Sequence, residues 1–585
     1  MKNEHSTLTE DVSNSPLYSE DLAPVPLSKR TWNKWSLAAL WVGMAVCVPT
    51  YMLAAQIIMS GINWKITLLI IGLGNLIITV PMVLSGHAGV KYGIPFPVLG
   101  RSSFGHNGVH IPAIIRGLIA AVWFGIQTWI GGIAVYSLYC ALSGAPQVLG
   151  ELSFGQFAGF GIFWLINVYF IVKGTESIKW LEIFAAPILI LMGIGLIMWG
   201  SSQVGSFGKV LTLGQQIESP TATFNTKDGK LDFIINPLRD KDNKVKATAY
   251  TITIPTTAEE GLKQAWTPLS QGGQPTRISL AGVTGIVKDD ILSGRKPVKL
   301  QLRAPTASGG FTTSKEHTFS PSPPQKKGMA NLWSYLVMLT AMVGFWATMS
   351  ISIADITRYT KTQSDQIQGQ LLGLPGTMIL YSFVGIFVTC AAILVFDDVL
   401  MREDAPWDPA ALLSRFESPV VIIISQIFLI IATLSTNIAA NVIAPANAFS
   451  NAFPKKINFM KGGLLTAVLG IIICPWYIIN HIIPFLLFVS SLLGPAVAIM
   501  ICDYFFIRNT NLNVNDLFKT NGEYSFGGGG FNSAAMIAFF VGVFFGGIGY
   551  FVPSLSFLYD ISWFVGFGVS FILYFVLMRG KVKQA

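Results

Sequence analysis

Four apolar segments of this 585-residue chain contain side chains whose types and spacing could bind a ligand. The first, residues 36–60, includes Gly43, Cys47 and Pro49. A proline inside a helix lacks a backbone donor and frees carbonyl groups, which can then coordinate a cation. The alternative interpretation is a simple kink that binds nothing.

The second segment, residues 111–142, contains the run WFGIQTW, in which Trp123 and Gln127 are four residues apart. This spacing places both side chains on one face of a helix. An aromatic ring beside a carboxamide suits a flat heterocycle, which can stack on the ring and hydrogen-bond to the amide. The alternative is a tryptophan at a helix interface and a glutamine bonded to a neighbouring helix. We expect Trp129 to have a structural role.

The third segment, residues 331–354, has Gly344, Phe345 and Trp346 near its middle. Hydroxyl side chains able to satisfy the backbone of a broken helix follow, namely Thr348, Ser350 and Ser352. Asp355 and Arg358 come next. For these two we expect an ion pair at the helix end, or part of a gate, rather than contact with a substrate.

The fourth segment, residues 420–449, places Ala432, Ser435 and Thr436 at positions i, i+3 and i+4. Two hydroxyls and a carbonyl then converge on one face, as in a weak oxygen site for a hard monovalent cation. Asn437 and Asn441 project from a different face. Hydroxyl side chains also join membrane helices without binding any ligand, which is the alternative.

The elements that carry these residues are predicted to be membrane helices. Hydrophobic residues make up 52% of the chain and charged residues only 12%, whereas about a quarter of the residues in a soluble domain are charged. Apolar windows of about 20 residues, long enough to span a bilayer, recur along the sequence. We count twelve, at 36–60, 66–86, 111–142, 155–173, 180–200, 331–354, 370–396, 420–449, 462–480, 482–506, 531–552 and 561–579.

The distribution of Lys and Arg predicts the orientation, because these residues resist translocation. An even number of spans puts both termini on one side, and the connections on that side carry basic residues, such as Lys91, Arg101, Lys455 and Lys456. The connection at 396–417, on the opposite side, is acidic. We therefore expect a multi-pass protein of the inner (plasma) membrane with cytoplasmic N- and C-termini.

Residues 205–328 do not fit the membrane pattern. Two stretches, Ala247–Ile254 and Val298–Arg303, alternate with period two, which predicts strands in a β-rich extracytoplasmic insert. The insert has 17 Lys and Arg against 10 Asp and Glu, but this basic charge is not a nucleic-acid signature. A surface role, a partner-binding role and an insertion without consequence all remain open.

The sequence disfavours several classes of protein. All five cysteines lie in apolar spans or at their edges, so neither a disulfide framework nor a metal cluster is implied. The chain has no HExxH motif, Walker-type loop or nucleophile elbow, which argues against an enzyme and against ATP-driven transport. A channel would need a continuous polar pore, whereas the polar groups cluster at one level. A sensor that signals through the insert is a further alternative.

Several long motifs occur together in this chain: GHAGVKYGIPFPVLGRSSFG from Gly86, then WFGIQTW, FWATMSISIADITRYTKTQSDQIQGQLLGLPG and ATLSTNIAANVIAPANAF. In this order they resemble the type-one nucleobase:cation symporter family, the permeases for cytosine and purines, uracil, thiamine and allantoin. The resemblance implies an all-α, leucine-transporter-like fold with two inverted repeats of five helices and two trailing helices. The domains would be a tail (1–35), first repeat (36–204), insert (205–328), second repeat (329–506) and final helices (507–585).

The resemblance also implies a substrate site. Trp123 and Trp346 would sandwich the ring of a nucleobase, allantoin or hydantoin, and Gln127 and Asn441 would hydrogen-bond its polar edge. Two further positions differ between branches of the family. Cys47 stands where hydantoin- and allantoin-type members carry Gln or Asn, and Phe345 resembles the uracil and allantoin branch.

A sodium ion would be held by the carbonyls of Gly43, Val46 and Ala432 and by the hydroxyls of Ser435 and Thr436. Some members of the family use protons instead. No carboxylate lies in the middle of the four segments, so we expect sodium rather than a proton relay. We expect no cofactor beyond this coupling ion, and a monomer whose partners are the lipid bilayer and the heterocycle, with no nucleic acid.

Overall fold

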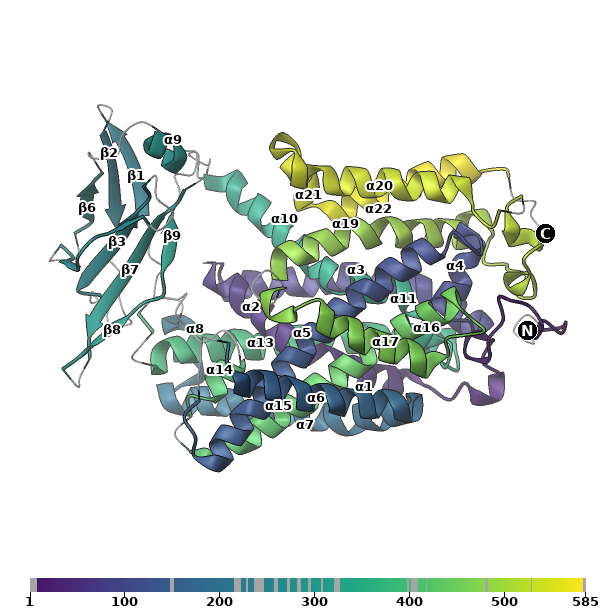
Figure 1. The fold of residues 1–585 in the computed structure, drawn as a ribbon, viewed down its shortest axis with the longest axis horizontal. Coiled ribbons are helices and arrows are strands. Elements are labelled where there is room, and N and C mark those ends of the chain that lie inside the picture. The colour runs from purple at the N-terminus through teal and green to yellow at the C-terminus, as the bar shows by residue number, and fades with distance from the viewer. Residues whose placement is uncertain are drawn as a thin grey trace.

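The computed structural model describes residues 8–60, 62–147, 152–214, 222–227, 230–235, 247–256, 261–270, 274–280, 286–292, 296–306, 309–319, 327–396, 399–400, 409–416, 418–478, 482–527 and 529–581. Most of these residues are helical. The helices form one bundle, with a group of strands beyond one of its ends (Figure 1). Both chain termini lie at the opposite end of the bundle (Figure 1).

The first group of helices precedes the strands. It comprises α1 (Lys34–Ala45), α2 (Val48–Met59), α3 (Trp64–Tyr92), α4 (Phe96–Phe104), α5 (His110–Ser143), α6 (Phe154–Lys173), α7 (Thr175–Val204) and α8 (Phe207–Leu213). The second group follows the strands. It comprises α10 (Lys327–Phe345), α11 (Ala347–Ser352), α12 (Ala354–Thr357), α13 (Gln363–Val395), α14 (Pro409–Leu413), α15 (Pro419–Asn441), α16 (Ile443–Ala452), α17 (Phe459–Ile472), α18 (Pro475–Ile478) and α19 (Ile482–Ile501).

Elements follow one another in a similar order in the two groups. Each begins with an interrupted helix (α1/α2 and α10/α11), followed by a long helix (α3 and α13), a short one (α4 and α14) and another long one (α5 and α15). After α19 come a π-helix (Cys502–Ile507), α20 (Ser533–Phe551), α21 (Ser556–Asp560) and α22 (Ser562–Met578). This order agrees with two repeats and a C-terminal pair.

Nine helices in the described part of the chain are long and apolar enough to cross a membrane, or up to eleven if each bent pair is one span. The predicted ninth span, 462–480, corresponds to α17, which is a shorter apolar helix. The expected count of twelve therefore remains a prediction.

Two interruptions shape the interior of the bundle. Helices α1 and α2 meet at an angle of 61°, and Pro49 lies in the first turn of α2, where its missing N–H costs no helical hydrogen bond. Trp346 separates α10 from α11 with non-helical angles (φ −105°, ψ 9°). Both interruptions therefore fall at the residues that the sequence indicated as helix breakers or their neighbours.

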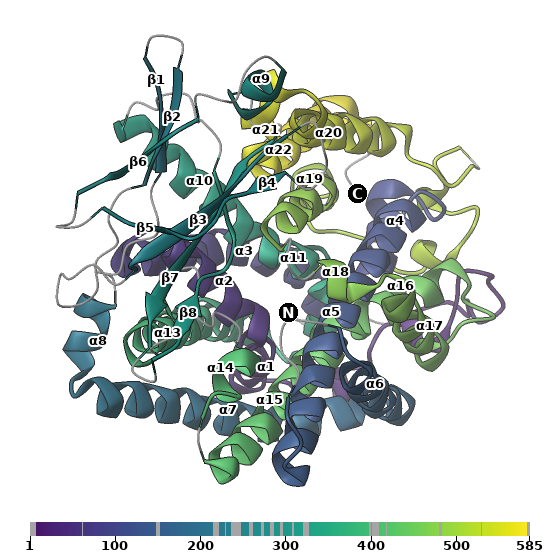
Figure 2. The ribbon, with the colours of Figure 1, turned by 60° about the vertical axis from the view of Figure 1, so that its left-hand side comes forward.

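The strands form two antiparallel sheets. The three-stranded sheet has the order β1 (Ala222–Lys227), β2 (Lys230–Ile235), β6 (Thr276–Ser279). The larger sheet contains β3 (Ala249–Ile254), β4 (Leu262–Lys263), β5 (Thr267–Pro268), β7 (Val298–Pro305), β8 (Phe311–Thr313) and β9 (His317–Phe319). The alternating stretches 247–254 and 298–303 thus contain β3 and most of β7, which run side by side in Figure 2.

The insert is not separate from the rest of the chain at its edges. Leu400, from the connection between α13 and α14, is 1% exposed and packs in the same hydrophobic cluster as Leu300 and Leu302 of β7. Helix α8, which lies inside the predicted insert boundary at 205, packs against α7 and α13 and buries Val210 and Leu211 among the membrane helices. The sheets therefore contact the α13–α14 connection through Leu400, at the end of the molecule away from the termini (Figure 1).

Helices α5 and α6 pack closely through glycines. A Cβ atom on Gly132 would lie 2.5 Å from the backbone nitrogen of Phe160, and one on Gly159 would overlap the carbonyl oxygen of Gly132. Small residues let membrane helices approach in this way. A Cβ atom on Gly161, two residues further along α6, would meet no atom of a neighbouring segment within 4 Å.

This contrast gives a stability prediction. Gly159→Ala should destabilise the protein by about 1–3 kcal/mol, because the added methyl group overpacks the α5–α6 contact. Gly161→Ala is the matched control and should leave stability unchanged or raise it slightly, since alanine favours helix over glycine. Thermal melting of the detergent-purified variants, followed by size-exclusion chromatography, measures both; equal melting temperatures would contradict the predicted packing.

Candidate substrate and ion site

A small cavity of about 30 Å³ lies where the interrupted helices meet α5 and α15. All six residues predicted to contact a substrate line it, together with further residues that sequence reasoning did not assign there. The complete lining is Met44, Cys47, Pro49, Trp123, Gln127, Phe345, Trp346, Thr348, Thr436, Ala440 and Asn441. This volume is far below the several hundred Å³ of a typical ligand pocket, so side chains must move to admit a ring.

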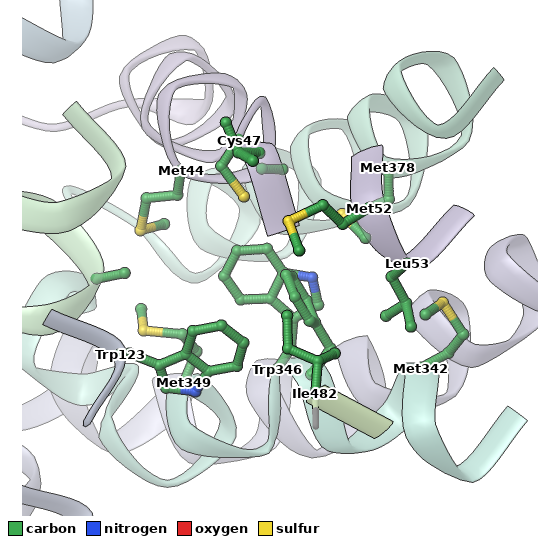
Figure 3. Close-up of a cluster of buried hydrophobic side chains, with 14 of the residues drawn as sticks. Met44, Cys47, Met52, Leu53, Trp123, Met342, Trp346, Met349, Met378 and Ile482 are labelled. Atoms are coloured by element: carbon green, nitrogen blue, oxygen red, sulfur yellow. The ribbon is translucent and has the colours of Figure 1, made fainter. Parts of the chain in front are cut away.

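The aromatic side chains form an edge-to-face cluster. Phe345 contacts Trp123 (ring centroids 5.6 Å apart, 76° between planes) and Trp346 (5.1 Å, 88°). Trp346 also meets Trp41 at 5.2 Å and 87°, and Trp123 meets Phe485 at 5.6 Å and 68°. Figure 3 shows the two indoles near Met44 and Cys47 in one buried cluster. Among the described residues the two indoles do not stack directly on each other, and Phe345 contacts both of them.

Two polar atoms of the cavity residues are buried without a hydrogen-bond partner in the described part of the chain. They are the acceptor Oε1 of Gln127 and the donor Nε1 of Trp346. A buried polar atom without a partner costs about 1–3 kcal/mol, so a ligand that supplies one gains affinity. A ring with adjacent N–H and C=O groups offers both kinds of partner.

Asn441 is oriented by its neighbour on α15. Its Nδ2 donates to Oδ1 of Asn437 (3.1 Å). The Nδ2 of Asn437 in turn donates to Thr128 Oγ1 (3.1 Å) and Asn167 Oδ1 (3.1 Å). Asn437 therefore joins α15 to α5 and α6, and it holds the carboxamide of Asn441 at the cavity.

Three of the five predicted ion ligands, Gly43, Ser435 and Thr436, lie together beside the cavity. Thr436 Oγ1 donates to the carbonyl oxygens of Gly43 (3.0 Å) and Met44 (3.3 Å), and Ser435 Oγ lies 3.5 Å from that of Gly43. Val46, at the end of α1, shares a buried cluster with Ala432. Carbonyl and hydroxyl oxygens at a helix break are the donor set that suits a hard cation. The residues present therefore fit a sodium ion.

Asp355 and Arg358 are arranged differently from the expected ion pair. Asp355 Oδ1 accepts from the backbone N–H of Phe96 (3.0 Å). Arg358 donates to the carbonyl of Asp21 (2.9 Å) and to the Tyr359 hydroxyl (2.8 Å). Among the described residues no ion pair within 4 Å joins the two side chains, although the charge of Arg358 still interacts electrostatically with Asp355.

Arg116 is a buried residue of α5 that sequence reasoning missed. It is fully buried and binds the backbone of Thr348 and Ala440, two residues of the cavity lining. The sequence could have indicated its importance, because Arg116 is the only charged residue in the predicted span 111–142.

Comparison with known proteins identifies the family. The family described as permease for cytosine/purines, uracil, thiamine, allantoin matches residues 24–226 and 302–566, which is most of the chain. The chain belongs to this family. The resemblance drawn from the motifs is thereby confirmed, and residues 227–301 of the insert lie outside the match.

Relatives of this permease are transporters. It is 32% identical to the allantoin permease of Bacillus subtilis (strain 168), over 96% of this chain and 93% of that one. It is 32% identical to the purine-uracil permease NCS1 of Arabidopsis thaliana, over 90% and 70%. Since these relatives are permeases, the chain is a multi-pass membrane transporter rather than an enzyme.

The fold is also that of known transporters. A structure of Mhp1, a nucleobase-cation-symport-1 family transporter with bromovinylhydantoin bound, superposes with a TM-score of 0.66 at 22% identity, covering 96% of this chain and 95% of the other. A Na⁺-coupled sialic acid symporter superposes with a TM-score of 0.51 at 11% identity, over 95% and 91%. The helical bundle is therefore shared with symporters.

The cavity predicts the effect of removing each indole. Trp123→Ala and Trp346→Ala should each weaken binding of a heterocyclic substrate by about 5- to 150-fold, the effect of losing one aromatic–base stack of about 1–3 kcal/mol. Equilibrium binding to purified protein measures this. Trp35→Ala is the control, because Trp35 on α1 is 66% exposed and remote from the cavity lining. Unchanged affinity in either cavity variant would exclude that indole from the site.

Proposed function

We propose that this permease imports a small planar heterocycle, such as uracil, cytosine, allantoin or hydantoin, in symport with sodium. The observation that carries the proposal is the unpaired acceptor of Gln127 at a cavity lined by two indoles. Trp123 and Trp346 would stack on the ring, Gln127 and Asn441 would bind its edge, and Phe345 and Cys47 would close the remaining sides.

The relatives support a choice of first probes. The two relatives at 32% identity are named an allantoin permease and a purine-uracil permease. Allantoin and uracil each carry a ring N–H group, which matches the unpaired acceptor of Gln127. We therefore propose these two compounds as the substrates to test first, in binding and in uptake assays.

Sodium is proposed to occupy the oxygen cluster between α1 and α15. The carbonyls of Gly43, Val46 and Ala432 and the hydroxyls of Ser435 and Thr436 would hold it. The structural support is the convergence of Gly43, Ser435 and Thr436 on one point. Hydroxyls and carbonyls cannot themselves titrate, so this cluster favours a metal cation over a proton.

The coupling can be measured directly. If sodium binds at the helix break, sodium and substrate should each raise the affinity for the other by one shared factor, typically about 5- to 150-fold. In the double variant Ser435→Ala/Thr436→Ala, substrate should still bind but lose this response. The assay compares substrate affinity in sodium and in choline.

Ser425→Ala/Thr433→Ala is the matched control on the same helix, and it should keep the sodium response, since neither hydroxyl contacts the α1 carbonyls. If the wild type responded to external pH and not to sodium, the proton-coupled alternative within the same family would replace the sodium proposal.

We also propose twelve spans, made up of the nine long helices, the two bent pairs and α17. The basic connections then place both termini in the cytoplasm and the strands outside. The strands and the two termini lie at opposite ends of the molecule, which supports this arrangement (Figure 1). We expect the protein to act as a monomer in the plasma membrane.

Thiol labelling of intact cells tests the orientation. In a Cys474→Ser background, Lys263→Cys in the exposed strand β4 should react with a membrane-impermeant maleimide from outside. Asn521→Cys, exposed in the connection after α19, should react only after the cells are permeabilised. The reverse pattern would invert the proposed topology.

A further inference from the structure

One of the buried arginines of the bundle lies next to residues of the cavity lining. Arg116 on α5 is fully buried. Trp123 follows it by seven residues, which is about two helical turns, so the two side chains share a face about 10 Å apart along the axis. Charged groups at this depth are costly and are retained where they have a specific task.

The guanidinium connects two helices through their main chains. Its Nε donates to the carbonyl oxygen of Thr348 (2.7 Å) and to Ser352 Oγ (3.2 Å), both on α11. Its Nη2 donates to the carbonyl oxygen of Ala440 on α15 (3.2 Å). The Ser352 hydroxyl also donates to the Thr348 carbonyl (2.8 Å), so Arg116, Thr348 and Ser352 form one hydrogen-bonded group.

The two residues that carry these carbonyls line the cavity and lie next to helix interruptions. Thr348 comes two residues after Trp346, where α10 ends and α11 begins. Ala440 directly precedes Asn441, the last residue of α15. Arg116 therefore fixes the backbone that carries two of the proposed substrate contacts.

The contact also crosses between two sets of helices. α5 packs against α6, α15, α16 and α17, whereas α11 packs mainly against α3 and α19. In transporters built from repeats, alternating access moves one such set against the other. A hydrogen bond from α5 to α11 is then made in some states of the cycle and broken in others.

Spare polar atoms surround the arginine. Arg116 Nη1 and Asp355 Oδ2 are buried without hydrogen-bond partners among the described residues. Asp355 interacts electrostatically with Arg116 and is close to Asn447. These groups provide partners for the guanidinium in an arrangement where α11 has moved.

We propose that Arg116 is a positioning residue of the transport cycle: it holds α11 and α15 together beside the cavity, on the side of the chain termini, and releases α11 when the site opens toward that side. This inference rests on the proposed transport function. Lysine cannot replace it, because one ammonium group cannot reach both carbonyls as the planar guanidinium does.

The test uses Arg116→Lys with a reporter cysteine at Ala444, four residues beyond Ala440 on α16, which packs against both α5 and α12. Maleimide labels the reporter in purified protein, and the protein without the reporter serves as the blank. Arg116→Lys should raise the labelling rate about tenfold or more, because losing a hydrogen bond from a charged group shifts a two-state equilibrium by that order. Net uptake should fall about tenfold while substrate affinity changes by less than about threefold.

Arg508→Lys is the control, since Arg508 is also buried but binds Asp503 and the Ser102 carbonyl, away from the cavity. It should leave the reporter rate unchanged even if stability falls. An unchanged reporter rate in Arg116→Lys overturns the proposal. If that variant does not fold, Ser352→Ala decides in its place: a faster rate supports the proposal and an unchanged rate overturns it.

The labelling requires no substrate, so failure of the substrate proposal can be distinguished from failure of the Arg116 proposal. If the wild type transports neither allantoin nor uracil, the substrate proposal fails and the reporter still decides the role of Arg116. If the wild type transports one of them while Arg116→Lys labels and transports normally, the function stands and the role of Arg116 is rejected.

Discussion

The constraint on which this structure depends is that a helix interrupted in an apolar medium leaves backbone groups that must find partners inside the protein. The bundle interrupts helices after Ala45, at Trp346 and at Val442. Hydroxyls of α15 bind the carbonyls at the first interruption, and Arg116 binds carbonyls beside the other two. The interruptions thus bring polar groups together at one level of the bundle, and the cavity lies there.

Features that depend on local residue type could be predicted from the sequence. Apolar windows locate the helices, Pro49 marks the break between α1 and α2, and the spacing of Trp123 and Gln127 puts both on one face of α5. Period-two alternation located β3 and β7. Each of these patterns involves only a few neighbouring residues, so it can be recognised without knowledge of the fold.

Contacts between distant segments could not be predicted in the same way. Arg116 stands out in the sequence as an isolated charge. Its partners are backbone carbonyls, however, and because every residue has a carbonyl, the sequence does not indicate which ones bind the arginine. Asp355 and Arg358 carry opposite charges three residues apart, but packing offered each a partner from elsewhere. Leu400 belongs to a connection between helices and lies in the core of the strands, because a short segment joins whichever apolar cluster is within reach.

The arrangement also explains how an ion and a substrate could influence each other without a long path. Met44 and Cys47 line the cavity, and the carbonyls of Gly43 and Met44 accept the hydroxyl of Thr436, which lines the cavity too. One short stretch of α1 therefore belongs to both proposed sites. An ion bound at the proposed site would fix this stretch and so change the walls of the cavity. A ring that spreads the indoles would act on the same backbone, so the proposed coupling would arise where the two ligands share a segment.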